Sequence, residues 1–404
     1  MTAAWRPRVV VCGTGFGRTY LAGVAGLAGR GEPVELAGVL ARGSARSQQC
    51  ARHYGVPLYT DVDQLPAGIE IACVVVSAGI NGGRGAELAQ RLMARGVHVL
   101  QEHPLHQAEL AECLRQARRH GVVYHVNSHY VHVASVATFV RAARRLLAGQ
   151  RPVFVDALTS FQVLYTMVDL LGQALGGIRP WSLAVAPAPA PGVPEVLRSV
   201  SGSLGGVPAT LRVQNQMHPE ERDNGAHVMH RVTLATEGGD LLLANTLGPV
   251  LWNPRLHMPA DYQEAVTVAA STAAHLDLPG ATVLGPSRLP SHRQVIGQEW
   301  PAAAGRALLE LRQAVLDGAD PLPRGQYHLA LCRLVAEVTG QLGRPEVRAT
   351  GAPRIVEAAA LVGADGHGAD GHPADGHGAD GHGADGYRAD GDFAGSSPAG
   401  PPAR

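Results

Sequence analysis

The stretch VVVCGTGFGRTYLAG, residues 9–23, indicates the fold of the first part of the chain. An apolar run passes into a turn with three glycines, and a helical pattern follows the turn. This order is typical of the first strand and helix of a dinucleotide-binding sheet, although the spacing G-x-G-x-G is one residue shorter than the usual fingerprint. Backbone N–H groups at such a turn can approach a pyrophosphate. The candidates for this contact are Gly13, Thr14, Gly15, Phe16 and Gly17.

The alternation of short apolar runs and helical patterns continues along the chain. It predicts a doubly wound α/β domain of the Rossmann type, with a parallel sheet, over residues 1–126. The predicted strands are 8–13, 34–41, 71–77, 97–102 and 122–126.

The order of strand-like and helical patterns changes after residue 127. Strand-like runs then follow one another closely with glycine turns between them, and helical patterns stand before and after the runs. This arrangement predicts an α+β domain with a mainly antiparallel sheet over residues 127–360. Within it, the Ala/Pro-rich stretch 186–194 predicts a stiff surface loop.

Residues 361–404 form a third predicted segment, in which a five-residue unit, Ala-Asp-Gly-His-Gly with variations, repeats. Such a segment cannot bury enough apolar surface to offset the entropy of ordering, so we expect a disordered tail. Its regularly spaced histidines could instead bind a transition metal loosely; they are His367, His372, His377 and His382.

The composition predicts a soluble, cytoplasmic protein of about two folded domains. No apolar run approaches the ~18 residues of a membrane span, and no signal-peptide pattern precedes the first strand. The five cysteines are widely spaced and form neither a metal-binding nor a disulfide pattern, and no nucleic-acid-binding motif is present. The sequence contains no lysine, so all 34 residues of the Lys+Arg total are arginines. No lysine can therefore take part in the chemistry.

The end of the second predicted strand favours NADP(H) over NAD(H). NAD-binding enzymes usually place Asp or Glu here for the ribose 2′-hydroxyl, and that carboxylate would repel a 2′-phosphate. This chain has Arg42, Ser44 and Arg46 instead. Guanidinium groups and a hydroxyl suit a phosphate, although the arginines could merely solvate a helix terminus. Ser77, at the end of the third strand, is a further cofactor candidate.

The fourth predicted strand ends in Glu102, His103 and Pro104, at the sheet edge where open α/β folds bind their ligands. A Rossmann domain followed by an α+β sheet domain resembles the glucose-fructose oxidoreductase and inositol dehydrogenase superfamily. Many members end this strand in Glu-Lys-Pro, and many carry a second-domain helix with Asp followed four residues later by His. Here the strand has histidine in place of lysine, and Asp169 is followed by Gln173. Both departures argue against a sugar dehydrogenase.

Six blocks in the same order resemble a narrower group, the thiazolinyl imine reductases of the yersiniabactin and pyochelin siderophore pathways. The blocks are VLARGSARS, GVPLYT, GVHVLQEHPLH, LYTMVDLLGQALG, MHRVTLATEG and LGPVLW. The resemblance extends from about residue 7 to about residue 350 and implies NADPH-dependent reduction of a thiazoline C=N bond to a thiazolidine. The substrate would be an intermediate held as a thioester by the carrier domain of a nonribosomal peptide synthetase.

The resemblance also implies roles for individual residues. His103 takes the place of the family's proposed general acid, and Tyr130 that of the second proposed proton donor. Glu102 would orient the imidazole or shape the cofactor pocket, so that Glu102 and His103 both count as cofactor contacts. Tyr130, Asp169 and Asn127 are candidates for binding the substrate. The superfamily often pairs its second-domain sheets, which implies a homodimer.

The chemistry agrees with these roles. Hydride transfer to carbon leaves charge on a weakly basic nitrogen, so a positioned acid should accelerate the reaction by ~10²- to 10⁴-fold, and histidine can hold that proton near neutral pH. The hydride comes from nicotinamide and the proton from a side chain, so no metal is needed. Two alternatives stay open: an NADP-dependent sugar or polyol dehydrogenase of the same superfamily, and a regulatory protein that binds NADP without catalysis.

Overall fold

The computed structural model describes residues 5–78, 82–187, 195–220, 225–264, 272–349 and 351–362. The chain divides into two compact units, Met1–Thr350 and Gly351–Arg404. In the second unit the described part includes one short helix, α11 (Ala359–Val362). Most of the predicted loop 186–194 and nearly all of the predicted tail 361–404 lie outside the described residues. No helix in the described ranges is long and apolar enough to cross a membrane.

The first sheet is parallel, with the strand order β3-β2-β1-β4-β5-β6, which confirms the predicted doubly wound domain. Its strands are β1 (Arg8–Cys12), β2 (Glu35–Leu40), β3 (Leu58–Tyr59), β4 (Ile71–Val74), β5 (His98–Glu102) and β6 (Tyr124–Asn127). The helices between them are α1 (Gly17–Gly29), α2 (Ala45–Tyr54), α3 (Gly85–Met93) and α4 (Gln107–His120).

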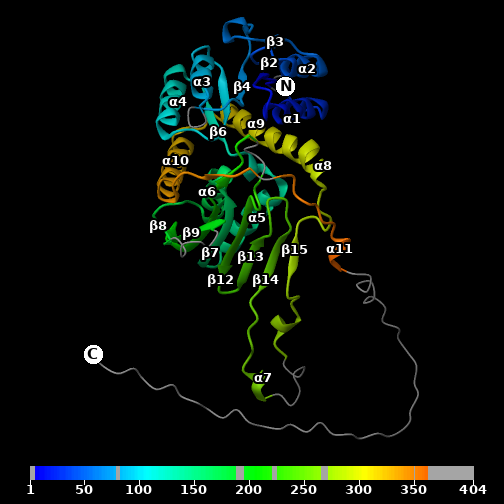
Figure 1. Cartoon of the computed structure of the whole chain (residues 1–404), viewed down its shortest axis with the longest axis vertical. Coiled ribbons are helices and arrows are strands. Elements are labelled where there is room, and N and C mark those ends of the chain that lie inside the picture. Colours follow the sequence, from blue (N-terminus) through cyan, green and yellow to red (C-terminus); the bar gives the residue numbers. More distant parts are fainter. Residues whose placement is uncertain are drawn as a thin grey trace, which may run out of the picture. The chain divides into compact units, whose positions relative to one another are not determined.

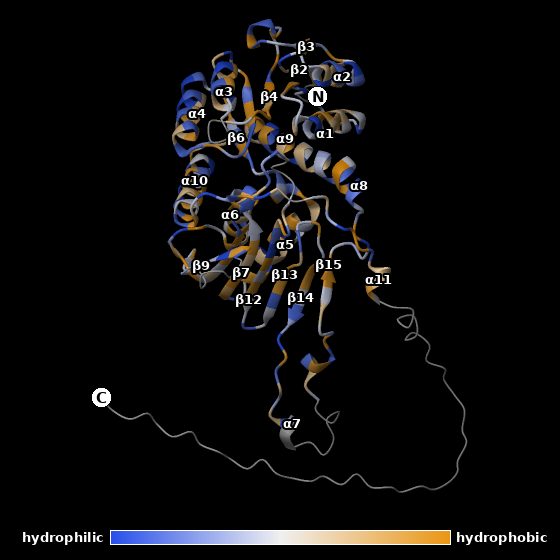
Figure 2. Cartoon of the chain, viewed as in Figure 1, coloured by the Kyte–Doolittle hydropathy of each residue, from blue (hydrophilic) through white to orange (hydrophobic). Residues whose placement is uncertain are grey.

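The helices of this domain are amphipathic, as their sequence patterns predict. Helix α4 buries Leu110, Cys113 and Ala117, which are spaced along one helical face. The helix carries both hydrophilic and hydrophobic residues (Figure 2). Apolar side chains therefore fill the space between helix and sheet, while charged ones such as Arg118 remain at the surface.

The second sheet has the order β15-β14-β13-β12-β7-β10-β9-β8 and confirms the predicted, mainly antiparallel arrangement. Only the β7–β10 pair among its described neighbours is parallel. Its strands are β7 (Pro152–Ser160), β8 (Trp181–Val185), β9 (Leu197–Leu204), β10 (Val207–Gln214), β12 (His230–Thr236), β13 (Gly239–Leu243), β14 (Val250–Pro254) and β15 (Thr282–Leu284). A separate small sheet pairs β11 (Gln216–Met217) with β16 (Glu346–Val347).

Helices α5 (Ala134–Leu147) and α6 (Leu164–Leu175) pack against this second sheet (Figure 1). Helix α6 follows β7 through a short 3-10 turn at Phe161–Val163. Nearly every residue of α6 is buried, including Tyr165 and Asp169. The helix therefore brings polar side chains into the interior, where each needs a partner.

Two helices that come late in the sequence pack against helices of the first domain. Helix α9 (Trp300–Leu316) packs along α1, and α10 (Leu322–Leu342) packs against both α4 and α6 (Figure 1). The apolar cluster shared by α1 and α9 contains Tyr20, Leu21, Val24, Leu27, Ala304, Ala307, Leu308 and Leu311. The predicted division at residue 126 falls one residue before the end of β6, and α9, on the far side of that division, completes the core of the first domain.

Candidate active site

The carboxyl end of β5 carries the Glu-His-Pro motif, and the His103–Pro104 bond is cis. The His103 backbone N–H donates to the carbonyl of Asn127 at the end of β6, at 3.1 Å. The His103 side chain is 9% exposed, and its Nδ1 lies 2.8 Å from Glu102 Oε1 and 3.1 Å from the Asn127 carbonyl oxygen. The backbone and the imidazole of His103 are therefore both held by the ends of two neighbouring strands.

These contacts assign the protons of the His103 ring. Both neighbours of Nδ1 are acceptors, so Nδ1 carries a hydrogen, and Nε2 has no hydrogen-bond partner among the residues that the structure describes. Burial by itself lowers the pKa of His103, but the hydrogen bond and negative charge of Glu102 more than offset it, so the pKa is raised above 6.5. The ring can thus hold a second proton on Nε2 near neutral pH.

The side chain of Glu102 is ionised. Burial raises its pKa, but His103 and the Tyr20 hydroxyl outweigh burial, and the pKa of Glu102 is lowered below 4.5. Its Oε2 accepts hydrogen bonds from the Tyr20 hydroxyl and, at 3.1 Å, from Asn127 Nδ2. Asn127 is fully buried, and its amide nitrogen faces Glu102 and Tyr20. Asn127, a predicted substrate residue, therefore holds Glu102 in place through its side chain.

Tyr130, the second predicted proton donor, lies in the 3-10 turn that follows β6, His129–His132. Its ring contacts His129, His230 and Trp300, with centroid separations of 5.4, 5.1 and 6.2 Å. Burial lowers the pKa of His129 to about 4 and that of His230 to about 3, so both are neutral. Both also respond to the charge of His103, which places the two predicted donors in one region of the fold.

Asp169, a predicted substrate residue, is buried in α6. Its Oδ1 accepts hydrogen bonds from Gln173 Nε2 at 3.1 Å and from the Tyr327 hydroxyl at 2.8 Å. Its Oδ2 is buried without a partner among the described residues. The negative charge of Asp169 contributes to the raised pKa of His103. The structure thus brings Asp169 near the motif, with Gln173 in contact where the superfamily pattern has histidine.

Several residues of this region escaped the sequence reasoning. Tyr20 carries a visible signal, because it follows the glycine turn on the buried face of α1. Tyr165 stands four positions before Asp169 on the same helix, which is a weaker signal. His328 and Trp300 carry none, since they approach the motif only through tertiary packing.

The glycine turn has the form that a dinucleotide needs. Gly13 has φ +96°, and a Cβ there would lie 2.5 Å from the Val75 carbonyl oxygen, so only glycine fits. At Gly15 a Cβ would meet no protein atom within 4 Å. Helix α1 begins after Phe16 without a side-chain cap and without an acidic residue in its first turn. Open space beside uncapped N–H groups suits a pyrophosphate, so these residues fit the cofactor that the fold implies.

The two glycines should respond differently to alanine. We expect Gly13→Ala to lower the free energy of unfolding by about 1–3 kcal/mol through backbone strain and the clash with Val75. Gly15→Ala should leave stability within about 0.5 kcal/mol, since its methyl group meets no protein atom. The same methyl group should weaken binding of the dinucleotide about tenfold by crowding the phosphates. Thermal unfolding with a fluorescence titration of NADPH would check both, and equal destabilisation by the two variants would contradict this account.

The other predicted cofactor residues stand at the same sheet edge. Ser44 caps α2, because its hydroxyl accepts the Ser47 N–H at 3.3 Å. Arg42 and Arg46 are exposed, and neither forms an ion pair with a described residue. Ser77 is exposed after β4, which ends three residues earlier than predicted, and its carbonyl accepts the Gly85 N–H at 2.9 Å. Both arginines are therefore available to a ligand.

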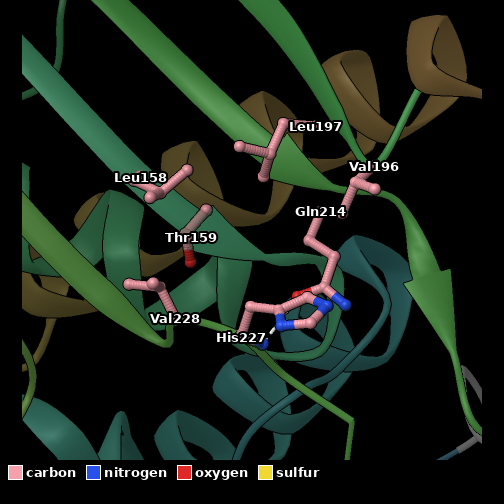
Figure 3. A pocket seen from close by; sticks show the side chains of 7 residues that line it. All are labelled: Leu158, Thr159, Val196, Leu197, Gln214, His227 and Val228. Atoms are coloured by element: carbon pink, nitrogen blue, oxygen red, sulfur yellow. Dashed lines mark hydrogen bonds between the residues drawn. The ribbon is translucent and has the colours of Figure 1, made fainter. Parts of the chain in front are cut away.

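A cavity of about 290 Å³ lies on the second sheet, away from these residues. Figure 3 shows its lining at the ends of β7, β9 and β10: Leu158, Thr159, Val196, Leu197, Gln214, His227 and Val228. Gln214 accepts the His227 N–H at 2.8 Å there. No predicted catalytic or cofactor residue lines this cavity, so it is a feature separate from the Glu-His-Pro motif.

Comparisons with known proteins agree with this architecture. Residues 7–128 match the family described as "Oxidoreductase family, NAD-binding Rossmann fold", and residues 150–253 match "Thiazolinyl imine reductase Irp3-like, C-terminal". No curated protein sequence matches the chain.

Solved structures share the fold at low sequence identity. An oxidoreductase from Agrobacterium radiobacter in complex with NAD+, L-tartaric acid and magnesium is 12% identical, with a TM-score of 0.59 over 83% of this chain and 96% of that one. A putative myo-inositol dehydrogenase from Sinorhizobium meliloti is 15% identical, with a TM-score of 0.57 over 83% and 97%. A variant of KijD10, a 3-ketoreductase from Actinomadura kijaniata in complex with TDP-benzene and NADP, is 16% identical, with a TM-score of 0.57 over 84% and 98%. At these identities the likeness shows the fold alone.

Proposed function

Since the chain belongs to the oxidoreductase family with the NAD-binding Rossmann fold and carries the C-terminal domain of the Irp3-like thiazolinyl imine reductases, we propose that it reduces the C=N bond of a thiazoline to a thiazolidine. The substrate in this proposal is a thioester on the carrier domain of a nonribosomal peptide synthetase. The observation that carries the proposal is the state of His103, whose Nδ1 is bound to Glu102 while Nε2 has no partner among the described residues.

The proposed reaction adds one hydride and one proton across the C=N bond. Bound NADPH supplies the hydride to carbon, and the chain supplies the proton to nitrogen. His103 in its charged form donates from Nε2, so that a new N–H bond forms as the Nε2–H bond breaks. Glu102 stays ionised and keeps Nδ1 protonated, which leaves a neutral ring with one tautomer. Solvent then returns the proton to Nε2.

The preference for NADPH is part of the proposal. Arg42 and Arg46 are exposed beside the end of β2, and no acidic residue occupies residues 41–46 to repel a 2′-phosphate. We expect the double substitution Arg42→Ala with Arg46→Ala to raise the KM for NADPH about tenfold or more, since each charge-assisted hydrogen bond to phosphate contributes about 1.5–3 kcal/mol. The KM for NADH should hardly change. Arg52→Ala, at the other end of α2, is the matched control, and equal effects on both cofactors would refute the preference.

The decisive experiment measures NADPH oxidation with an aryl-thiazoline, offered both as a carrier-bound thioester and as a small soluble thioester. Formation of the thiazolidine, identified by mass spectrometry, supports the proposed reaction, and faster turnover of the carrier-bound form supports the carrier partner. A wild-type chain that binds NADPH but reduces neither substrate would reject the proposal.

A second candidate is an NADP-dependent dehydrogenase of a sugar or polyol, since a putative myo-inositol dehydrogenase shares this fold. The chain lacks lysine altogether, and Gln173 contacts Asp169 where the superfamily pattern has histidine. Oxidation of myo-inositol or a related polyol in the same assay, without thiazoline reduction, would favour this candidate. Cofactor binding with no turnover of either class would favour a regulatory protein.

A further inference from the structure

The imidazole of His103 lies face to face with an aromatic ring from the second domain. The Tyr165 and His103 rings are nearly parallel, at an interplanar angle of 13° and a centroid separation of 5.2 Å. Tyr165 belongs to α6 and is 5% exposed. The edge of the imidazole is held by Glu102 and its face by Tyr165, so the two contacts constrain different rotations of the ring.

Tyr165 is itself anchored from a third element. Its hydroxyl lies 2.9 Å from Nδ1 of His328 on α10, 163 positions later in the chain. Burial lowers the pKa of His328 to about 4 and raises that of Tyr165 well above 10, so both partners are neutral. A buried hydroxyl that kept no partner would be costly. The bond therefore fixes the depth and plane of the tyrosine ring beneath His103.

We propose that Tyr165, anchored by His328, is a positioning residue for the proton donor: its ring holds the His103 imidazole in place and favours its charged form. The attraction between a cation and the face of a tyrosine ring is stronger when both are removed from water, as they are here. This inference rests on the proposed function, because it assigns a purpose to the charged form of His103.

The charged groups around His103 are compatible with this contribution of the Tyr165 ring to its protonation. Glu102 on β5 and Asp169 on α6 are the carboxylates that favour its charged form. Three histidines on neighbouring elements lie close enough for the charge of His103 to lower their pKa, and all three are neutral near pH 7. They are His129 in the 3-10 turn, His230 on β12 and His328 on α10. The tyrosine ring therefore acts beside two negative charges and against no fixed positive charge among these groups.

The test measures the titration of His103 directly, in the full-length chain without cofactor or substrate. Isotope labelling of the histidine rings allows titration by NMR, and the signal missing from His103→Ala assigns His103. We expect Tyr165→Leu to lower the pKa of His103, because the ring is lost. Tyr165→Phe keeps the ring but loses the anchoring hydrogen bond to His328, so it should give a smaller decrease than Tyr165→Leu. His328→Phe removes the same hydrogen bond from the other partner and should give a similarly small decrease, which still tests the inference if Tyr165→Leu does not fold.

Kinetics supply the second readout. In thiazoline reduction, Tyr165→Leu should lower kcat about tenfold with little change in the KM for NADPH, a size that a desolvated cation–π contact can reach. The matched control is Tyr54→Leu, which removes a different tyrosine–histidine contact, the one with His53 at 4.8 Å on α2. It should change neither the titration of His103 nor kcat.

The outcomes separate this inference from the proposed function. An unchanged His103 titration in folded Tyr165→Leu and in His328→Phe would overturn the inference, whatever the activity. A lowered pKa together with a wild-type chain that reduces no thiazoline would support the contact between Tyr165 and His103 and reject the proposed reaction instead.

Discussion

Replacing His103 by alanine is expected to lower kcat for the proposed thiazoline reduction by about 10²- to 10⁴-fold, the usual contribution of a positioned general acid. The physical reason is the arrangement at the end of β5. Nδ1 is committed to Glu102 and Asn127, so Nε2 is the ring atom that can deliver a proton. The glycine turn that fits the cofactor belongs to a different strand and helix. NADPH affinity, measured by fluorescence titration, should therefore change little.

Two further variants make this result specific. His53→Ala removes an exposed histidine on α2 and should be indistinguishable from wild type. Tyr130→Phe removes the hydroxyl of the second predicted donor and keeps the ring contacts with His129, His230 and Trp300. A larger loss of kcat in Tyr130→Phe than in His103→Ala would transfer the role of proton donor to Tyr130.

The second large effect is expected from Glu102→Gln, and it depends on pH. A general acid works while it is protonated, so activity is present below the pKa of His103 and is lost as the pH rises through it. In the wild type Glu102 raises this pKa above 6.5. Without that negative charge, the Asn127 carbonyl and Asp169 are the remaining groups that raise the pKa of His103 against burial, so the pKa falls and activity is lost at a lower pH. At pH 8 we expect kcat to fall by about 10- to 100-fold relative to wild type, with a much smaller loss near pH 5.

The measurement is a profile of kcat against pH for both proteins. Glu112→Gln, which removes an exposed carboxylate of α4 that pairs with Arg115, serves as the control and should leave the profile unchanged. If Glu102→Gln lowers kcat by the same factor at every pH, Glu102 does not set the protonation of His103.

The same pair should also affect stability in a defined pH range. The pKa of Glu102 is lowered in the folded chain, so its contribution is present above about 4.5 and is lost as the pH falls. The pKa of His103 is raised, so its contribution is present below about 6.5 and is lost as the pH rises through the folded-state pKa. The decrease in Tm caused by Glu102→Gln should therefore be largest between these two limits.

The first sheet was predictable from sequence because its signals are local. Buried parallel strands appear as continuous apolar runs, and β1, β2, β4, β5 and β6 were found from them within a few residues. Strand β3 was missed because two residues, Leu58 and Tyr59, are too few to form a pattern. In the second sheet, the apolar stretch 240–252 contains parts of two strands, β13 and β14, and the segment that joins them includes the cis Gly248–Pro249 bond.

The site was predictable only where its residues follow a strand directly. Glu102 and His103 end β5, and their place in the sheet follows from the strand itself. Apart from its place four positions before Asp169, nothing local distinguishes Tyr165, which stacks on His103, from the apolar residues of α6 that fill the core. His328 becomes relevant only when α10 packs on α6. The contacts of Asn127 also depend on tertiary packing, because the Tyr20 hydroxyl beside its amide comes from α1.

The return of α9 to α1 affects the order in which the chain can fold during synthesis. The cofactor-binding sheet is complete in sequence at Asn127, yet the apolar face of α1 stays uncovered until Ala304, Ala307 and Leu311 have left the ribosome. Between those two points, the nascent first domain lacks the cover that α9 gives to Gly23 and Leu27. Contacts between residues so distant in sequence form slowly. The first domain to be made is thus among the last to become stable, and a fragment that ends near residue 126 lacks the helix that protects it from aggregation.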